Sequence, residues 1–297
     1  MEADDVVLSF LLLLSFFFLL SFSSFFFFFF FFFFLLLFFF FYFSTNQDIA
    51  ITTTKTLVLE YPLFIVQPGV GSRSPYKHDL DAPTRFGVLP RHPHKGERPR
   101  WFEASSCFAY HSANAFESDD GRYITIVACV SPHMNLGGLG STMYRFKRFT
   151  IDLERNDGQV DREEDLAVGV DAEFPTVDPR LVGRRCRYVY AAKFAEAPGK
   201  KVTESFDGVI KLDLETGYTT THTFSGGGLG GEVAFAPYGL EEEDGVLLTF
   251  VFDPVTNTSS VYVIDARTMN CVATVGLPKR VPFGFHSTWA AEVAKVM

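Results

Sequence analysis

The chain has 297 residues, a net charge of −9, 36 phenylalanines and four cysteines. Twenty of the phenylalanines lie in residues 1–43, so the aromatic excess belongs to one segment, and the remaining residues, about 250, are enough to bury a substantial core. The acidic balance argues against a nucleic-acid partner, which needs a basic face. No CxxC pair occurs, which argues against a zinc cage or a disulfide framework and favours a reducing compartment.

Residues 1–43 form a low-complexity tract in which every position from Leu8 to Phe41 is Phe, Leu or Ser. This exceeds the roughly 20 apolar residues that cross a bilayer, so one interpretation is a transmembrane helix. Natural spans have a mixed composition and basic flanks, whereas Glu2, Asp4 and Asp5 precede this tract. The acidic start also argues against a signal peptide and a transit peptide.

A DNA run of thymines with scattered cytosines encodes the same three amino acids, Phe, Leu and Ser. The tract therefore has the composition expected when the 3′ end of an intron is translated. We favour this interpretation, under which the N-terminal exons are missing from the chain. Residues 1–43 are therefore left out of the fold prediction, and residues 44–297 are predicted to form the folded part.

Residues 44–289 contain many short β-branched runs separated by turns. In the clearest stretch, the runs Gly245–Phe252, Ser260–Asp265 and Cys271–Val275 are joined by turns of a few residues, which predicts an antiparallel meander. Similar runs occur at 123–130, 144–153 and 208–224, and no amphipathic helix of a dozen residues is apparent. The pattern predicts an all-β propeller or large sandwich, with about five blades at roughly 40–50 residues each.

Two further segments are predicted to be structural. The glycine-rich stretch 226–231 lacks the lysine of a phosphate-binding loop, so we expect a loop where the backbone passes close to another part of the chain. The acidic run 241–244 is predicted to be a solvated turn before a strand.

Two of the seven histidines, His111 and His286, are surrounded by aromatic and small residues. A neutral imidazole buried there needs a hydrogen-bonding partner, and each residue by itself fits a core histidine better than a metal ligand. The other five are expected to be surface or structural residues: His78, His92, His94, His133 and His222.

Five segments form a distinctive set: Asp48-Ile-Ala-Ile-Thr52 with Tyr61-Pro62-Leu63; Arg85-Phe-Gly-Val-Leu-Pro-Arg91; Trp101-Phe-Glu103 with Phe108-Ala-Tyr-His111-Ser-Ala-Asn114-Ala-Phe-Glu117; Gly230-Gly-Glu232-Val-Ala-Phe235; and Val281-Pro-Phe-Gly-Phe-His286-Ser-Thr-Trp289. As a set they resemble the carotenoid cleavage oxygenase family, also known from the retinal pigment epithelial membrane protein, in the family's order. The resemblance implies a seven-bladed β-propeller, here a partial one truncated at its N-terminus. In the family, four histidines from different blades hold an iron on the propeller axis.

The resemblance also assigns roles to single residues. His111 would be the third iron ligand and His286 the fourth, while Glu232 and Glu173 would accept hydrogen bonds from ligand imidazoles. Such a carboxylate fixes the tautomer of the histidine and strengthens it as a ligand.

The chain departs from the family where the second ligand is expected. Gln47 replaces that histidine, and an amide oxygen is a poorer donor for iron than imidazole. The first ligand would lie further upstream, where only the Phe/Leu/Ser tract precedes. We therefore expect two of four ligands to remain, with weak Fe(II) binding and exposed strand edges where blades are absent.

The implied function is oxidative cleavage of a double bond in a carotenoid or apocarotenoid, of the 9-cis-epoxycarotenoid dioxygenase type. It would use Fe(II) and O2 on an apolar polyene, and it is expected to be impaired in this chain. One alternative is a non-catalytic truncated propeller, and another is an interaction protein anchored in a membrane by the tract. The resemblance implies a plastid location, with the cytosol or a membrane as alternatives.

Overall fold

The computed structural model describes residues 44–65, 76–134, 144–197, 200–282, 284 and 286–290. The chain divides into two units, and the larger one comprises residues 44–63 and 77–297. Phe64, Ile65 and Tyr76 are the described residues of the other unit. The predicted low-complexity tract, residues 1–43, lies outside the described residues. Among the residues that are described, no helix is both long and apolar enough to cross a membrane.

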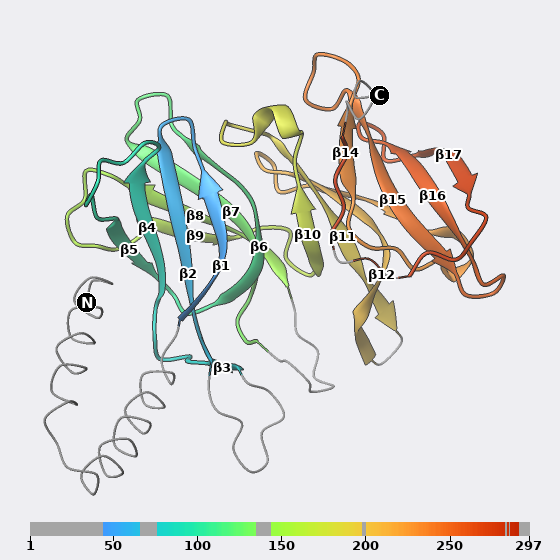
Figure 1. Ribbon diagram of the computed structural model, residues 1–297, viewed down its shortest axis with the longest axis horizontal. Helices are drawn as coiled ribbons and strands as arrows, with labels where there is room; N and C mark the ends of the chain where they lie inside the picture. Colours follow the sequence, from blue (N-terminus) through green and yellow to red (C-terminus); the bar gives the residue numbers. More distant parts are fainter. Residues whose placement is uncertain are drawn as a thin grey trace, which may run out of the picture. The chain divides into compact units, whose positions relative to one another are not determined.

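Strands make up nearly all of the regular structure that is described, in four sheets that succeed one another along the chain (Figure 1). The first sheet has the order β1-β2-β4-β5, and β3 pairs with β2. The other three are meanders in chain order, β6 to β9, β10 to β13 and β14 to β17. The strands of the first two sheets are β1 (Ser44–Ile51), β2 (Lys55–Ile65), β3 (Tyr76–His78), β4 (Thr84–Pro90), β5 (Arg100–Ala104), β6 (Phe108–Glu117), β7 (Tyr123–Ser131), β8 (Arg145–Asp152) and β9 (Arg162–Asp165). Those of the last two are β10 (Ala172–Thr176), β11 (Tyr188–Ala197), β12 (Lys200–Asp213), β13 (Thr219–Thr223), β14 (Ala234–Pro237), β15 (Gly245–Asp253), β16 (Thr258–Asp265) and β17 (Cys271–Gly276).

The described residues thus confirm the all-β prediction, and their only helical segments are two 3₁₀ turns, η1 (Pro179–Leu181) and η2 (Ser225–Gly227). The expected number of about five blades is wrong for this part of the chain, because it forms four sheets. Each sheet uses more residues than estimated, since long connections such as residues 91–99 and 177–187 separate strands.

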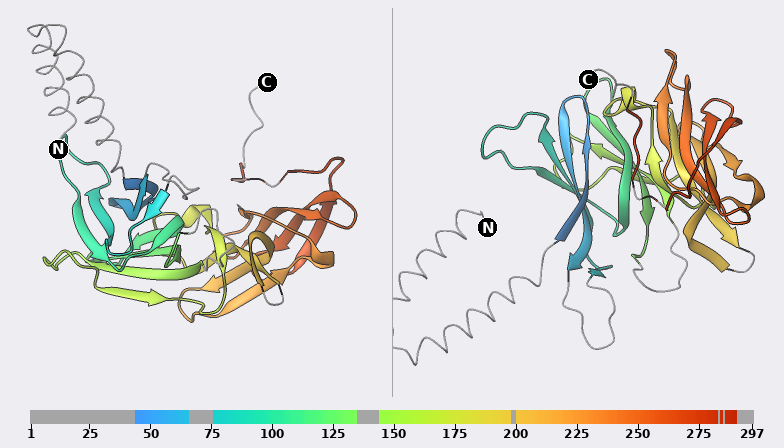
Figure 2. Two further views of the ribbon diagram at one scale, coloured as in Figure 1. Left: turned by 90° about the horizontal axis from the view of Figure 1, so that it is seen from below. Right: turned by 45° about the vertical axis from the view of Figure 1, so that its right-hand side comes forward.

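Side-chain alternation explains why neighbouring sheets stack. In β7, Ile126 packs into the core between the first and second sheets, while the next residue, Val127, packs into the core between the second and third. Ile210 and Val209 of β12 divide in the same way between the second and third cores. Successive side chains of a strand point to opposite faces, so a strand buried on both faces must be apolar at nearly every position. Three cores therefore join the four sheets face to face (Figure 2).

The glycine-rich stretch agrees with the expected close approach. A Cβ on Gly230 would lie 2.4 Å from the ring of Phe224, and one on Gly228 would lie 2.8 Å from Val251. Gly226 has a φ of 65°, which residues with a Cβ rarely adopt. The loop thereby brings Leu229 and Gly230 into bridges with Phe252 and Phe206.

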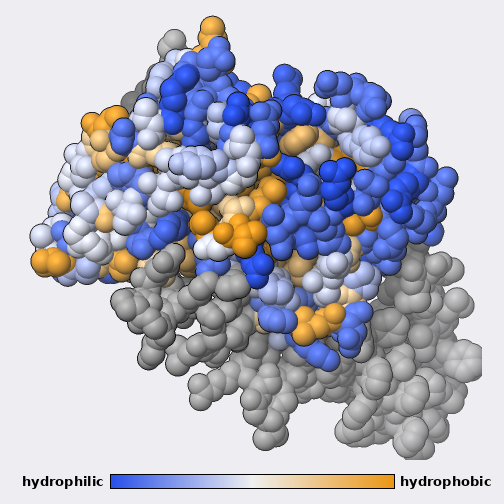
Figure 3. All heavy atoms as spheres, turned by 180° about the vertical axis from the view of Figure 1, so that it is seen from behind, coloured by the Kyte–Doolittle hydropathy of each residue, from blue (hydrophilic) through white to orange (hydrophobic). Residues whose placement is uncertain are grey.

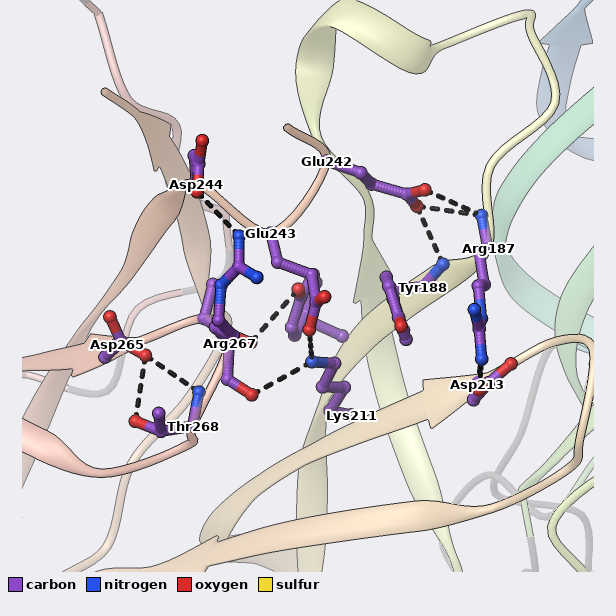
Figure 4. A network of polar contacts seen from close by, with 12 residues as sticks. Arg187, Tyr188, Lys211, Asp213, Glu242, Glu243, Asp244, Asp265, Arg267 and Thr268 are labelled. Atoms are coloured by element: carbon purple, nitrogen blue, oxygen red, sulfur yellow. Dashed lines mark hydrogen bonds and ion pairs between the residues drawn. The ribbon is translucent and has the colours of Figure 1, made fainter. Parts of the chain in front are cut away.

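The acidic run 241–244 is more than the solvated turn that the sequence predicts, because two of its side chains join the third sheet to the fourth and a third pairs within the fourth sheet (Figure 4). Glu242 accepts hydrogen bonds from the backbone N–H groups of Arg187 (2.8 Å) and Tyr188 (2.7 Å). Glu243 pairs with the buried ammonium of Lys211. Within the fourth sheet, Asp244 pairs with Arg267 at 2.8 Å. A charge run says nothing about the partners Arg187, Lys211 and Arg267, which lie at least 23 positions away in the sequence.

On the face opposite that of Figure 1, apolar side chains form small separate groups within a largely polar surface (Figure 3). Several of the large hydrophobic side chains that are exposed lie in turns, among them Leu240 and Val255. Isolated apolar residues of this kind are normal on a soluble surface.

Candidate metal centre

His111 lies in the middle of β6, where the strand departs from regular pairing with β7. Phe108 and Ala109 before it and Ala115 and Phe116 after it are buried, so both ends of the strand are anchored in the core. The register shifts between Ala109 and Ser112 and again between Ser112 and Asn114. Such bulges redirect a side chain out of the regular alternation, and here they occur around His111.

Glu173 of β10 is the partner of His111. Its Oε2 lies 2.7 Å from Nδ1 of the imidazole, and the Glu173 side chain is only 4% exposed. Burial raises the pKa of Glu173 and the contact with His111 opposes that rise. Burial alone would lower the pKa of His111, but the hydrogen bond and charge of Glu173 outweigh it, so the pKa is raised. When the imidazole is neutral and donates from Nδ1 to Glu173, Nε2 is its lone-pair nitrogen.

The backbone next to Glu173 is unusual. Phe174 has a φ of 54°, a left-handed conformation that is rare for a bulky residue, and the β10–β11 register shifts between Glu173 and Thr176. The Phe174 N–H donates to the carboxylate of Glu173. Strained conformations of this kind cluster at functional sites, where the surrounding structure holds them in place.

His286 follows the last strand, in an irregular segment. Its Nδ1 lies 3.5 Å from Oε1 of Glu232, and the exposed fractions of the two side chains are 54% and 21%. The backbone N–H of Ser287 donates to the other oxygen of the same carboxylate. The segment is also attached to β16, because the N–H of Val281 donates to Oγ of Ser259 at 2.9 Å.

The structure brings the two histidines together although 175 positions separate them in the sequence. Their ring centroids are 5.0 Å apart and the ring planes are nearly perpendicular, at 84°. The ring of Phe174 lies 5.1 Å from His111 and 5.7 Å from His286. Both imidazoles have a carboxylate at Nδ1, so Nε2 is the atom that each would offer to a metal.

A cavity of about 290 Å³ opens beside His286 and Glu232. Its wall is mainly aromatic and aliphatic, with Phe174, Phe206 and Leu229 among the lining residues. Aromatic contacts continue from it, since Phe206 contacts Phe194 at 4.5 Å and Phe194 stacks on Tyr144 at 5.9 Å. The cavity thus joins the His286–Glu232 pair to an apolar surface, and Phe174 in its wall also contacts His111.

Gln47 lies in β1, and its side chain is outside the described residues. The prediction that it replaces a ligand therefore stays a prediction. Its neighbour Asp48 is described, and it hydrogen-bonds Ser112 next to His111. The motif that contains Asp48 was recognisable in the sequence, but nothing there indicated this contact. Phe174, between the two imidazoles, was also missed, although it follows Glu173 directly.

The residues present fit half of a four-histidine iron site. Imidazoles held at Nδ1 by carboxylates are the usual form of metal-ligating histidine, and imidazole suits iron. Among the described residues, however, no group of three or more His, Cys, Asp or Glu side chains is placed to hold a metal ion. The described part of the chain thus offers two imidazoles, each with a carboxylate at Nδ1.

The sequence model of the family described as retinal pigment epithelial membrane protein matches residues 40–291. The chain belongs to this family. Among its family relatives is the carotenoid 9,10(9',10')-cleavage dioxygenase 1 of Pisum sativum, 32% identical over 271 residues, which cover 82% of this chain and 48% of the relative. The 9-cis-epoxycarotenoid dioxygenase NCED6, chloroplastic, of Arabidopsis thaliana is 30% identical over 251 residues, covering 82% of this chain and 42% of the relative. The family resemblance expected from the five segments is confirmed.

Solved structures of the family agree with the fold. The crystal structure of cobalt-substituted Synechocystis apocarotenoid oxygenase is 26% identical and matches with a TM-score of 0.72, over 84% of this chain and 53% of that chain. The four sheets are therefore blades of the family's β-propeller. The chain spans about half the length of the relatives that it matches.

Proposed function

We propose that His111 and His286 are two of the ligands of a non-haem iron(II) centre that cleaves a double bond of a carotenoid or apocarotenoid with O2. The observation that carries the proposal is the convergence of two imidazoles, each with a carboxylate at Nδ1, within 5.0 Å of one another. The printed functions of the relatives, which cleave carotenoids or 9-cis-epoxycarotenoids, support this substrate class. When bound, iron(II) would supply the position at which dioxygen is activated.

The chain's own residues orient the proposed ligands. Glu173 would hold the proton of His111 at Nδ1, which keeps Nε2 unprotonated and able to bind a metal. Glu232 does the same for His286 over a longer distance and also accepts the N–H of Ser287. Phe174 packs beside both rings.

The apolar wall of the cavity suits a polyene. Phe206, Leu229 and Phe252 present hydrocarbon surface next to His286, and a conjugated chain of carbon atoms offers nothing that needs a hydrogen bond. Burial of such a chain is favourable by about 25 cal/mol per Å² of apolar surface. The protein's contribution would be to place one double bond beside the metal.

We further propose that this chain by itself is a poor enzyme. Loss of a single residue that supports a ligand typically weakens metal affinity or activity by about 10–100-fold, and loss of two ligands should cost more. With two ligands in the described residues, we expect iron to bind weakly and cleavage to be slow.

The test is an anaerobic Fe(II) titration of the full chain, followed by O2-dependent cleavage of a carotenoid measured by chromatography. His111→Gln and His286→Gln should each abolish the residual iron binding, while His92→Gln, on an exposed loop, should leave it unchanged. Iron binding that survives both substitutions would overturn the site. Stoichiometric iron with rapid cleavage in the unaltered chain would overturn the proposed impairment.

A second candidate function is a non-catalytic propeller fragment, favoured by the lack of a third donor among the described residues. It predicts no oxygen-dependent cleavage at any iron concentration. A third, an interaction protein anchored in a membrane by residues 6–43, rests on a segment outside the described residues. Membrane fractionation tests it, and recovery of all the protein in the soluble fraction would contradict it.

A plastid location is proposed from two relatives from Arabidopsis thaliana whose names include the word chloroplastic. The cytosol is the alternative. Expression of the natural transcript with a fluorescent C-terminal fusion would decide between them.

A further inference from the structure

The backbone around His111 lacks the regular support of a β-ladder. Ala109 pairs with Val130 and Ser112 with Ala128, so three steps along β6 match two along β7, and Tyr110 and His111 lie in this irregular stretch. A second shift follows directly, between Ser112 and Asn114. A bulge leaves its extra residue unpaired, so other contacts must hold the direction of the His111 side chain.

Asp48 supplies such a contact from β1, in the neighbouring sheet. Its Oδ2 accepts a hydrogen bond from the backbone N–H of Ser112 at 2.7 Å and another from the Ser112 hydroxyl at 2.5 Å. Its Oδ1 accepts the N–H of Ile49 at 2.8 Å. One carboxylate thus ties the residue that follows His111 to the backbone of β1. Hydrogen bonds to a charged acceptor are about twice as strong as neutral ones.

A separate contact between the same elements provides a comparison. Glu117, at the far end of β6, accepts hydrogen bonds from the Thr52 hydroxyl and from the N–H and hydroxyl of Thr54, in the turn after β1. Both carboxylates therefore join β1 or its turn to β6. Asp48 binds at the position adjacent to His111, whereas Glu117 binds six residues away.

We propose that Asp48 is a positioning residue, which holds the bulged backbone at Ser112 so that the His111 imidazole stays aimed at Glu173 and His286. The metal part of this role rests on the proposed function. The geometric part does not, because the His111–Glu173 hydrogen bond exists without a metal. The hydrogen bonds of Asp48 reach Ile49 and Ser112, so it would act on His111 through the backbone.

The test compares Asp48→Ala with Glu117→Ala, using ¹⁵N-histidine NMR of the metal-free full chain and Co²⁺ titration followed by visible absorption. Both substitutions should lower the urea midpoint, because each removes hydrogen bonds between the same elements. Only Asp48→Ala should shift the His111 ring resonances and weaken Co²⁺ affinity, by about tenfold. Asp48→Asn keeps one acceptor oxygen and should recover part of both effects.

Equal His111 resonances and equal Co²⁺ affinity in Asp48→Ala and Glu117→Ala would overturn the positioning role. If the unaltered chain bound no Co²⁺, the proposed iron centre would fail instead. The His111 resonances of the metal-free protein would then still decide the role of Asp48. Recovery of the resonances by Asp48→Asn separates positioning from a general loss of folding.

Discussion

The two imidazole–carboxylate pairs differ in how the chain supports them. His111 and Glu173 both lie in strands, their atoms are 2.7 Å apart, and the carboxylate is 4% exposed. His286 and Glu232 both lie outside the strands, their atoms are 3.5 Å apart, and the imidazole is 54% exposed. The first pair is held by cores on both sides of its sheets, and the second by a few hydrogen bonds.

This difference indicates which half of the site, the His111–Glu173 pair or the His286–Glu232 pair, is held less firmly in place. A buried hydrogen bond inside packed sheets opens only when the sheets open, whereas an exposed segment can open locally at low cost. The His286 half should therefore respond to small changes nearby, and the His111 half to changes that affect whole sheets. Four predictions test this division, from the largest expected effect to the smallest.

The largest effect on stability should come from the contact between the third and fourth sheets. This contact holds together the two parts of the site, because Glu173 belongs to the third sheet and Glu232 directly precedes the fourth. Glu243→Ala removes the counter-charge of Lys211, whose side chain is 8% exposed. We expect the free energy of unfolding to fall by about 3 kcal/mol, the low end for a broken buried pair, since the Arg267 carbonyl still accepts from Lys211. Urea denaturation measures it. Glu241→Ala, at an exposed position of the same turn, should change it by less than about 0.5 kcal/mol.

The two carboxylates themselves should rank by burial. Glu173→Gln should weaken Co²⁺ affinity by about 10–100-fold, because it removes the negative charge from the short, buried contact that supports His111. Glu232→Gln should weaken it by less than about tenfold, because the 3.5 Å contact is long and more exposed. Titrations followed by visible absorption give both values. A larger loss of Co²⁺ affinity in Glu232→Gln than in Glu173→Gln would show that the burial of a carboxylate does not determine how strongly it supports its histidine.

Ser259→Ala should affect the His286 half alone. The substitution removes the acceptor of the Val281 N–H, a contribution of about 1 kcal/mol. Amide hydrogen exchange at Val281 should accelerate about fivefold, while exchange in β6 stays unchanged. Ser225→Ala, which removes an exposed hydroxyl contact with Tyr262, is the matched control. Equal acceleration in β6 would mean that the two halves open together.

The smallest effect should be the acid sensitivity of the third sheet. The Arg187 guanidinium holds the pKa of Asp213 well below its usual range. A carboxyl group with a lowered pKa stabilises the fold above its unfolded pKa of about 4, and this stabilisation disappears as the pH falls below that value. Arg187 is 43% exposed, so at most about 1 kcal/mol is expected. Asp213→Asn should reduce the loss of stability between pH 6 and pH 3, and an unchanged loss would contradict this assignment.

The sequence predicted the strands well, because their determinants are local. The β-branched runs at 245–252, 260–265 and 271–275 correspond to β15, β16 and β17 within one or two residues. The resemblance placed His111 near His286 and Glu173 near a histidine, and the structure shows both proximities. The ligand roles of these residues stay predictions.

The remaining features depend on contacts between distant strands, so the sequence could not show them. The bulges around His111 and the hydrogen bonds of Asp48 to Ser112 arise only when two sheets meet. The acidic run 241–244 is predicted from the sequence to be solvated. The sequence could not show otherwise, because the partners of Glu242 and Glu243 lie far away in the chain, in β12, at the start of β11 and just before β11. Chain length could not give the number of blades, since connections between strands vary.

The central strands β7 and β12 serve two cores at once, with neighbouring residues such as Ile126 and Val127 on opposite sides. Inserting one residue into such a strand would turn every side chain beyond the insertion to the opposite face. Each core would then contain side chains that fit the other core. Changes in chain length should therefore be tolerated in the connections, such as residues 91–99, and rejected in the central strands. A scan of single-residue insertions with a solubility readout would map this boundary along the chain.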